Sequence, residues 1–371
     1  MIAVVNGGTM RIAQVLFCLD MGGQEVMALH LTKELLARGH DVTVVSMNSG
    51  GSLRGEFAPA RIVDAPRKPE MGIDPKAWPK MFRTFLDIKP DVVHTHAPGP
   101  LLYAVPAARL AGVRRIVHTS HGANVTQLGP RSIALGRAVA LLLTRFVPVS
   151  GETAETARSR EKVPARLIEV IPNGIPLDRF GANAATRARI RAELGIPEGA
   201  FVVGTVGRVE AVKNHKLFVA SMAKLCGPET HAVLVGGGSL LDEVRASVPA
   251  EAAPFIHFTG PRRDVPDVLT ALDVFTLTST TEGLPLAIPE AMATELPVVA
   301  TEVGSLPTIV PKDTGILVPS GDLAGLVAAY SRLRENPLAR REMAKAARAF
   351  AHARFSLKTM VDAYEKIYRD G

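Results

Sequence analysis

The chain has 371 residues, of which 47% are hydrophobic and 21% charged, a composition that excludes a disordered or fibrous protein. Its two cysteines, Cys18 and Cys226, lie far apart in the sequence, which excludes a disulfide framework and a four-cysteine zinc site. The formal net charge is +7, and residues 1–180 carry all of the excess, with 22 Lys and Arg against 15 Asp and Glu. A basic half can face nucleic acid, an anionic membrane or a phosphorylated substrate, or it can simply be a solvated surface.

The chain carries no segment typical of membrane insertion or secretion. Residues 1–9 lack the basic flank and long apolar core of a signal peptide, so we interpret them as an extension outside the fold. The most apolar run, residues 133–143, is interrupted by Arg137 and is too short to span a bilayer. A reducing cytoplasm fits these features best.

Short, β-branched apolar runs alternate with amphipathic stretches along the whole chain, which predicts strands separated by helices in parallel α/β layers. The predicted strands of the first half cover residues 12–19, 42–46, 92–96, 115–120, 146–149 and 167–171. Those of the second half cover residues 201–206, 232–235, 256–259, 274–278, 298–301 and 315–318. Two similar series favour two doubly wound domains, with a single eightfold barrel as the weaker alternative.

Proline and Asn-Gly interrupt the pattern within residues 171–180, which we interpret as a linker that can act as a hinge. The predicted domains are therefore residues 10–178 and 179–351. Apolar side chains recur at helical spacing near the C-terminus, which predicts a closing helix within residues 352–371.

Gly22 and Gly23 lie in the turn between the first predicted strand and the helix after it. Glycines let the backbone approach a ligand closely, and a helix N-terminus offers free N–H groups to a phosphate. The turn is therefore a candidate diphosphate cradle, with an ordinary tight turn as the alternative. The third glycine of the dinucleotide fingerprint is missing and no GxxxxGK[ST] motif occurs, which disfavours an NAD site and a P-loop.

Two cations come after the first strand of the second half. Arg208 and Lys213 stand at a strand's carboxyl end, where open α/β sheets bind ligands, and they suit a pair of phosphates. Solvated surface cations are the alternative.

Two carboxylates, Glu282 and Glu290, flank the start of the helix after the predicted strand 274–278. Carboxylates can hydrogen-bond the hydroxyls of a ligand there, which would hold a sugar and a ribose together. Two capping or surface glutamates are the alternative, but the surrounding helix is almost wholly apolar and buried glutamates need partners.

His121 comes directly after the predicted strand 115–120 and can exchange protons or hydrogen bonds near neutral pH, although a structural histidine is the commoner case. His94 and His96 point to the same face of a strand, but no third ligand is evident, which argues against a metal site. No Asp-x-Asp pair occurs to hold a divalent ion on a nucleotide diphosphate.

Taken in order, these segments resemble the retaining glycosyltransferases of family 4, which have the GT-B fold. The motifs that carry the resemblance are Gly22-Gly23-x-Glu25, Asp91-Val-Val-His-Thr-His96, Ser120-His121-Gly122, Ile171-Pro-Asn-Gly174, Gly207-Arg208 with Lys213-Asn214, Leu234-Val-Gly-Gly-Gly238, Phe258-Thr-Gly260, Glu282 with Glu290-Ala-Met-Ala, Leu296-Pro-Val-Val-Ala300 and Gly315-Ile-Leu-Val-Pro319. The resemblance implies two Rossmann-like domains facing a cleft, with a C-terminal helix that crosses back to the first domain.

The resemblance also implies roles for single residues. Arg208 and Lys213 would bind the donor diphosphate, Glu282 the hydroxyls of the sugar, and Glu290 those of the ribose. The remaining implied donor contacts are Gly283, Leu284, Pro285 and Leu286, with Gly22 and Gly23 closing over the phosphate and His121 near the reacting carbon. Two departures from the family pattern are Gly304-Ser-Leu-Pro-Thr308, in place of the commoner Gly-Gly-x-x-Glu, and Pro285, where many members have glycine.

The function that the resemblance implies is front-face transfer of a hexosyl-type sugar with retention and without a metal or other cofactor, from a UDP- or GDP-sugar to a glycan. The first domain would bind a lipid-linked acceptor in polysaccharide, lipopolysaccharide or glycolipid assembly, at the cytoplasmic face of the inner membrane. Alternatives are a nucleotide-sugar epimerase or hydrolase of the same fold and a catalytically silent scaffold. Nucleic acid is disfavoured, because only 5% of the residues are aromatic and no recognition motif is evident.

Residues 75–89 are a basic amphipathic element, with Trp78 and Phe85 among its apolar residues and Lys80 and Arg83 among its basic ones. Such an element can contact anionic lipid headgroups. The alternative is an ordinary helix packed on its sheet.

Overall fold

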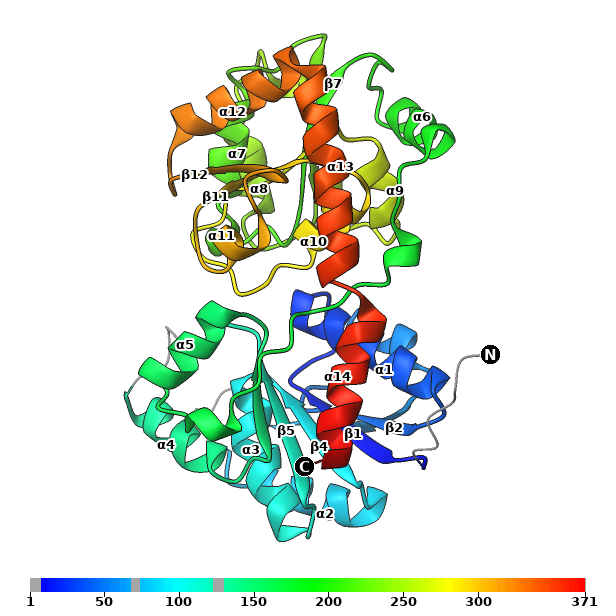
Figure 1. Ribbon diagram of the computed structural model, residues 1–371, viewed down its shortest axis with the longest axis vertical. Coiled ribbons are helices and arrows are strands. Elements are labelled where there is room, and N and C mark those ends of the chain that lie inside the picture. The colour runs from blue at the N-terminus through cyan, green and yellow to red at the C-terminus, as the bar shows by residue number, and fades with distance from the viewer. Residues whose placement is uncertain (1–7, 68–73, 123–129, 371) are drawn as a thin grey trace. The chain divides into compact units, whose positions relative to one another are not determined.

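The computed structural model describes residues 8–67, 74–122 and 130–370, and the chain divides into two compact units (Figure 1). Unit 1 contains Met1–Gly174 and Leu357–Gly371, and unit 2 contains Ile175–Ser356. None of the helices in the described ranges is both long and apolar enough to cross a bilayer. The expected extension, residues 1–9, lies almost wholly outside the described residues.

Unit 1 is a parallel sheet with helices between its strands, in the order β3-β2-β1-β4-β5-β6. The strands are β1 (Arg11–Leu16), β2 (Asp41–Ser46), β3 (Arg61–Asp64), β4 (Val92–His96), β5 (Arg115–Ser120) and β6 (Arg145–Pro148). The helices are α1 (Gly23–Ala37), α2 (Ala77–Ile88), α3 (Pro98–Leu110), α4 (Pro130–Ala140), α5 (Gly151–Ser159) and α14 (Leu357–Asp370).

Unit 2 repeats this architecture, with the strand order β12-β11-β10-β7-β8-β9. The strands are β7 (Phe201–Val206), β8 (Thr230–Val235), β9 (Ile256–Gly260), β10 (Val274–Leu277), β11 (Val298–Thr301) and β12 (Gly315–Val318). The helices are α6 (Ala184–Glu193), α7 (His215–Met222), α8 (Leu241–Ala246), α9 (Val265–Thr270), α10 (Ala287–Ala293), α11 (Leu306–Ile309), α12 (Leu323–Glu335) and α13 (Pro337–Arg354). In both orders the numbering reverses beside the first strand of the unit, so the prediction of two doubly wound α/β domains is confirmed.

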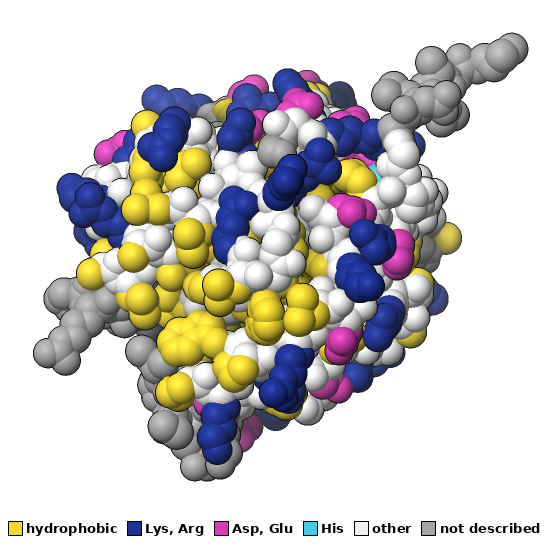
Figure 2. Space-filling view, turned by 90° about the horizontal axis from the view of Figure 1, so that it is seen from below, with side chains coloured by type: hydrophobic (Ala, Val, Ile, Leu, Met, Phe, Trp, Pro, Cys, Tyr) yellow, Lys and Arg dark blue, Asp and Glu magenta, His cyan; other side chains and the backbone are white. Residues whose placement is uncertain are grey.

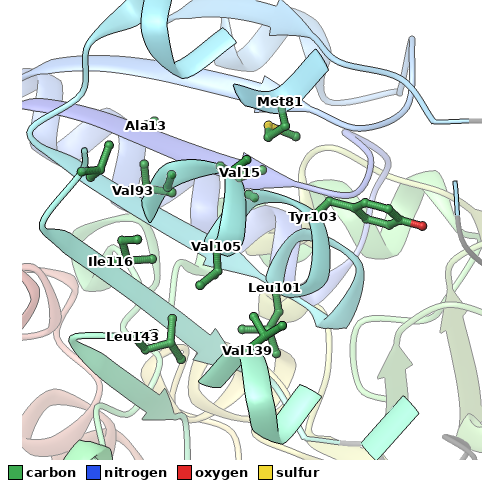
Figure 3. Packing of buried hydrophobic residues seen from close by; sticks show 14 of the residues in the cluster. Ala13, Val15, Met81, Val93, Leu101, Tyr103, Val105, Ile116, Val139 and Leu143 are labelled. Atoms are coloured by element: carbon green, nitrogen blue, oxygen red, sulfur yellow. The ribbon is translucent and has the colours of Figure 1, made fainter. Parts of the chain in front are cut away.

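The inner strands are buried on both faces, as parallel strands covered by helices require, and they therefore read as nearly continuous apolar runs. In unit 1, Ala13 and Val15 of β1 and Val93 of β4 point toward α2 and α3, where they meet Leu101 and Val105 (Figure 3). This cluster is the main core of the unit.

The opposite face of the same sheet lies against α14. His94 of β4 is hydrogen-bonded through Nδ1 to the Tyr368 hydroxyl at 2.6 Å and through Nε2 to Thr119 Oγ1 at 2.7 Å. Thr119 Oγ1 lies 2.8 Å from the hydroxyl of Tyr364, and both tyrosines are fully buried. At the end of α1, the Arg38 guanidinium lies 2.5 Å from Glu365 of α14. These contacts hold the C-terminal helix on unit 1.

One strand prediction in unit 1 was wrong, and one strand was missed. Residues 167–171 do not join the sheet as a strand: Ala165–Leu167 is a 3-10 turn, and Ile168 makes an isolated bridge to Phe146. The sheet instead gains β3, a strand of four residues at its edge. Only two of those residues, Ile62 and Val63, are apolar, which is too short a run to stand out in the sequence.

The basic amphipathic element is α2, and its apolar face is used inside the unit. Met81 and Phe85 are buried, and Trp78 donates from Nε1 to the Leu102 carbonyl of α3 at 3.0 Å. Most of its apolar face is therefore packed inside the unit, whereas Lys80, Arg83 and Leu86 are exposed.

Arg191 of α6 fastens the start of the unit 2 sheet. Its side chain is 1% exposed and donates to the carbonyls of Ala271 and Ala200 at 3.0 and 2.8 Å and to the Asp273 carboxylate at 2.9 Å. Asp273 in turn accepts from the Val202 backbone N–H at 2.8 Å. The cluster joins α6 to β7 and to the residue before β10.

We expect Arg191→Met to destabilise unit 2 by about 3 kcal/mol, because it removes the buried hydrogen bonds to the Ala271 and Ala200 carbonyls and one of the two ion pairs of Asp273, which keeps Arg187. Urea unfolding followed by circular dichroism measures this. The matched control is Arg189→Met on the same helix, where the arginine is 54% exposed and its ion pairs are worth at most about 1 kcal/mol. An equal loss of unfolding free energy in the two variants would contradict the stabilising role of Arg191.

Candidate functional site

The predicted cations and the first predicted carboxylate come after neighbouring strands of unit 2. Arg208 and Lys213 come after β7 and Glu282 after β10, and these two strands are paired in parallel. Their carboxyl ends therefore meet at the edge where the strand order reverses, which is the usual ligand site of an open α/β sheet.

Lys213 and Glu282 form an ion pair, with Nζ 2.6 Å from Oε1. The same carboxylate oxygen accepts from Ser279 Oγ at 2.6 Å, and the Glu282 side chain is 8% exposed. The carboxylate is thus oriented by two donors, while the lysine, 20% exposed, keeps further N–H groups for a ligand. Arg208 is exposed nearby in sequence.

The loops that carry this pair are also joined through the backbone. Thr278 Oγ1 donates to the carbonyls of Lys213 and Asn214 at 3.2 and 3.0 Å, and the Thr280 N–H donates to the Val212 carbonyl at 2.9 Å. The geometry of Lys213 relative to Glu282 therefore does not depend on the ion pair alone.

The loop that departs from the family pattern supports Glu282 from behind. Gly304 has a φ of +56°, and a Cβ there would collide with the Glu282 carbonyl oxygen. The N–H of Ser305 lies 3.4 Å from the same oxygen. This close approach requires glycine at position 304, independently of the departures at the residues after it.

Glu290 stands in the first turn of α10, directly after the segment Gly283, Leu284, Pro285 and Leu286. Leu284 and Leu286 are buried, so this segment offers its backbone rather than its apolar side chains. Burial raises the pKa of Glu290 to about 7, against an opposing effect of Arg179. Glu290 therefore titrates near neutral pH.

His121 stands at the carboxyl end of β5 in unit 1, beside His96. His96 Nδ1 lies 3.4 Å from His121 Nε2, and His96 Nε2 lies 2.7 Å from Gln14 Oε1. Burial lowers the pKa of His121 to about 4 and that of His96 well below its usual value. Both rings are therefore neutral at pH 7, and His121 can accept or donate a hydrogen bond there but not supply a positive charge.

Both ring nitrogens of His94 and of His96 have hydrogen-bond partners, Tyr368 and Thr119 for His94 and His121 and Gln14 for His96. Across the described ranges, no group of three His, Cys, Asp or Glu side chains is placed to hold a metal ion.

The glycine turn of unit 1 is occupied by a neighbouring side chain. Gly22 is the N-cap of α1, and a Cβ at this position would collide with Glu25 Oε2. Gln24 Nε2 donates to Glu25 Oε1 at 2.5 Å, and Glu25 is 5% exposed. A carboxylate therefore lies beside the glycine at the helix N-terminus that we expected to receive a phosphate, while a Cβ at Gly23 would meet open space.

Two contributors to these sites were missed in the sequence. Ser279 is fully buried and shares the Glu282 carboxylate with Lys213. The only sequence signal was the polar run Thr278–Thr281 directly after a buried strand. Gln14 sits on a strand among apolar neighbours, where an uncharged polar residue is the available signal of a buried hydrogen bond.

Glu290 makes a testable contribution to the pH dependence of stability. Its pKa is raised from 4.5 to about 7 in the folded state, so folding favours the protonated form, and its stabilisation is lost as the pH rises through 7. We compare the free energy of unfolding of Glu290→Gln with that of the wild type at each pH. The difference should be about 2 kcal/mol more in favour of the variant at pH 8 than at pH 5. Urea unfolding at the two pH values checks this, with the exposed Glu302→Gln as the control that should show no such difference.

Two family models match the chain. The model described as Glycosyltransferase Family 4 matches residues 21–179, and the model described as Glycosyl transferases group 1 matches residues 200–336. The chain is 31% identical over 348 residues to the 2-deoxystreptamine N-acetyl-D-glucosaminyltransferase of Streptomyces fradiae. The alignment covers 83% of this chain and 82% of the relative. It is 28% identical over 381 residues to the UDP-Gal:alpha-D-GlcNAc-diphosphoundecaprenol alpha-1,3-galactosyltransferase of Escherichia coli, with 97% of each covered.

Solved structures share the fold over nearly the whole length. HepE of Anabaena, crystallised with UDP-glucose, aligns with a TM-score of 0.86 at 21% identity, covering 98% of this chain and all of that one. WaaG, a glycosyltransferase involved in lipopolysaccharide biosynthesis, aligns with a TM-score of 0.79 at 17% identity, covering 97% and 100%. The two domains, the family models and the Streptomyces relative agree, and the chain belongs to the group 1 glycosyltransferases of family 4, with the GT-B fold.

Proposed function

We propose that this glycosyltransferase moves a hexosyl-type sugar from a UDP- or GDP-sugar to a lipid-linked glycan, with retention and without a metal. The observation that carries the proposal is the Lys213–Glu282 pair at the point in unit 2 where β7 and β10 meet. The pair supports the proposal because a cation is suited to phosphate and the carboxylate beside it is suited to sugar hydroxyls.

We take unit 2, with the predicted bounds 179–351, as the donor-binding domain. Each of its site residues has one proposed role. Arg208 and Lys213 bind the diphosphate and stabilise the charge that develops on the leaving nucleotide. Glu282, oriented by Lys213 and Ser279, accepts hydrogen bonds from the sugar. Glu290 accepts hydrogen bonds from the ribose, and the backbone of residues 283–286 lies between the two carboxylates.

In the first domain, residues 10–178, His121 contacts the donor sugar as a neutral hydrogen-bonding partner, because its low pKa excludes a charged ring at pH 7. Gly22 and Gly23 approach the phosphate through their backbone. Glu25 already lies beside Gly22, so Gly23, which has open space around it, is the more accessible of the two.

The bonds change in one balanced step. The bond between the anomeric carbon and the donor phosphate oxygen breaks, and the acceptor oxygen bonds to that carbon on the same face. The acceptor's proton passes to the departing phosphate oxygen, so no protein nucleophile is needed. Glu282 is held by two donors in the structure, which suits a hydrogen-bonding role rather than attack.

The acceptor class rests on the relatives. The Escherichia coli relative acts, by its name, on a diphosphoundecaprenol-linked sugar, and a relative from Mycolicibacterium smegmatis, 28% identical over 336 residues, is a GDP-mannose-dependent alpha-(1-6)-phosphatidylinositol monomannoside mannosyltransferase. These names support a lipid-linked acceptor, and both UDP and GDP as donor nucleotides.

We expect one series of UDP-, GDP- or ADP-sugars to raise the melting temperature of the wild type without added metal. Calorimetric titration of that donor should show binding about tenfold or more weaker in Lys213→Ala, because a charge-assisted hydrogen bond to phosphate is lost. Lys216→Ala is the matched control, since Lys216 is 51% exposed and pairs with Glu243.

Arg208→Ala separates ligand contact from folding. Arg208 is exposed, so its loss should leave the melting temperature unchanged while weakening the donor by about tenfold. No stabilisation by any of the three series, with or without Mg²⁺, would count against the donor site and favour the silent scaffold.

Retention and metal independence have their own test. With the donor so identified, NMR of the early product should show the same anomeric configuration as the donor, and excess EDTA should leave the rate unchanged. Inversion would overturn the same-face step. Turnover of the donor at the full rate without any acceptor would instead favour the epimerase or hydrolase.

A further inference from the structure

Four large apolar side chains are exposed at the same end of unit 1. Leu110 at the end of α3 is 79% exposed, and Leu141 and Leu142, directly after α4, are 56% and 37% exposed. Leu86, near the end of α2, is 46% exposed. All three helices precede strands of a parallel sheet, so they finish at the amino-terminal edge of that sheet. We call these four residues the leucine surface.

Hydrogen bonds hold the loops of the leucine surface together. Arg109 donates from Nε to the Leu142 carbonyl at 2.7 Å and from Nη1 to the Arg114 carbonyl at 2.6 Å. Thr144 Oγ1 donates to the same Arg114 carbonyl at 3.1 Å. The loops after α3 and after α4 therefore lie side by side, with their leucines presented by a fixed backbone.

Leu86 joins this surface through the packing of α2 on α3. The two helices run in the same direction, and Trp78 of α2 is bonded to the Leu102 carbonyl of α3. Eight residues further along each helix stand Leu86 and Leu110, at the same level of the unit.

The charge around the leucine surface is mostly positive, although Asp87, directly after Leu86, is exposed as well. Residues 92–151 contain six arginines and neither aspartate nor glutamate. Arg114 and Arg137 are exposed beside the leucines, and Lys89 is exposed at the end of α2. Figure 2, which looks onto the lower end of unit 1 as Figure 1 draws it, shows a contiguous group of hydrophobic side chains with Lys and Arg side chains around it and fewer Asp and Glu side chains among them.

We propose that the leucine surface docks on an anionic lipid bilayer. Exposed apolar side chains bordered mainly by cations suit a boundary of acyl chains and negative headgroups, where the leucines leave water and the arginines stay at the headgroups. A nucleic acid would match the charge but leave the leucines in water, and a second copy of this surface would oppose arginine with arginine.

Docking at this edge sets a minimum distance between the bilayer and His121. The meaning of this distance rests on the proposed function. The leucine surface lies at the amino ends of the strands, whereas His121 lies at the carboxyl end of β5. The six residues of β5 span about 20 Å, so the bilayer would lie at least about that far from His121. The arrangement suits an acceptor whose growing end extends away from its lipid.

Vesicle sedimentation of the full chain tests the proposal. The wild type should sediment with vesicles of phosphatidylcholine containing about one third phosphatidylglycerol and stay in solution with phosphatidylcholine alone. Joint Arg114→Gln and Arg137→Gln should weaken the binding about 30-fold, and joint Leu141→Ser and Leu142→Ser at least about tenfold.

Matched controls lie in unit 2. Leu338→Ser, at a site 73% exposed, and Arg332→Gln, also at an exposed site, should sediment like the wild type. Wild type that ignores anionic vesicles would overturn the proposal, as would loss of binding only in Lys80→Gln with Arg83→Gln on α2. Binding confined to native membranes and lost in the leucine variants would also overturn it, in favour of a membrane protein as partner.

The variants of the leucine surface also distinguish membrane docking from the proposed donor binding. Their donor-induced rise in melting temperature should equal that of the wild type, since the leucine surface lies outside unit 2. Vesicle binding without any nucleotide binding would leave the docking surface standing and remove the donor site. Nucleotide binding without vesicle binding would do the reverse.

Discussion

The parallel pairing of β7 with β10 is the constraint on which the candidate site of unit 2 depends. It brings two chain segments about 70 residues apart to one edge of the sheet, because parallel strands end on the same side. Lys213 and Glu282 meet there at 2.6 Å, and Ser279 completes the set. The pairing is itself secured at the other end of the strands, where Asp273 binds Arg191 and the backbone of Val202.

Unit 1 is organised around a different interaction, a network of neutral histidines on one face of its sheet. Burial lowers the pKa of His94 and His96, so both act as hydrogen-bonding rings between strands and helix. His94 connects β4 to Tyr368 of α14, and His96 connects Gln14 to His121. The C-terminal helix and the candidate catalytic histidine thus rest on neighbouring residues of the same strand.

The architecture was predictable because buried parallel strands leave apolar runs that alternate with helical segments, and the expected strands at 201–206, 298–301 and 315–318 match the observed ones. The errors occurred at a sheet edge. β3 was missed because an edge strand needs few apolar residues, and residues 167–171 run beside β6 through two backbone hydrogen bonds without forming a strand. At the glycine turn, Glu25 belongs to a family motif, but its place beside Gly22 was not foreseen.

The sequence by itself determined the two doubly wound domains, the family and the identity of the charged residues that come after each strand, because these depend on local patterns along the chain. Only the tertiary structure decided which of them meet: Lys213 pairs with Glu282, and Ser279 shares the carboxylate. It also decided that α2 packs most of its apolar face inside unit 1, with Trp78 bonded to α3. It also left Leu110 and Leu141 exposed to solvent. The reason is physical: partner choice and exposure arise from chain segments far apart in sequence, and no local pattern encodes them.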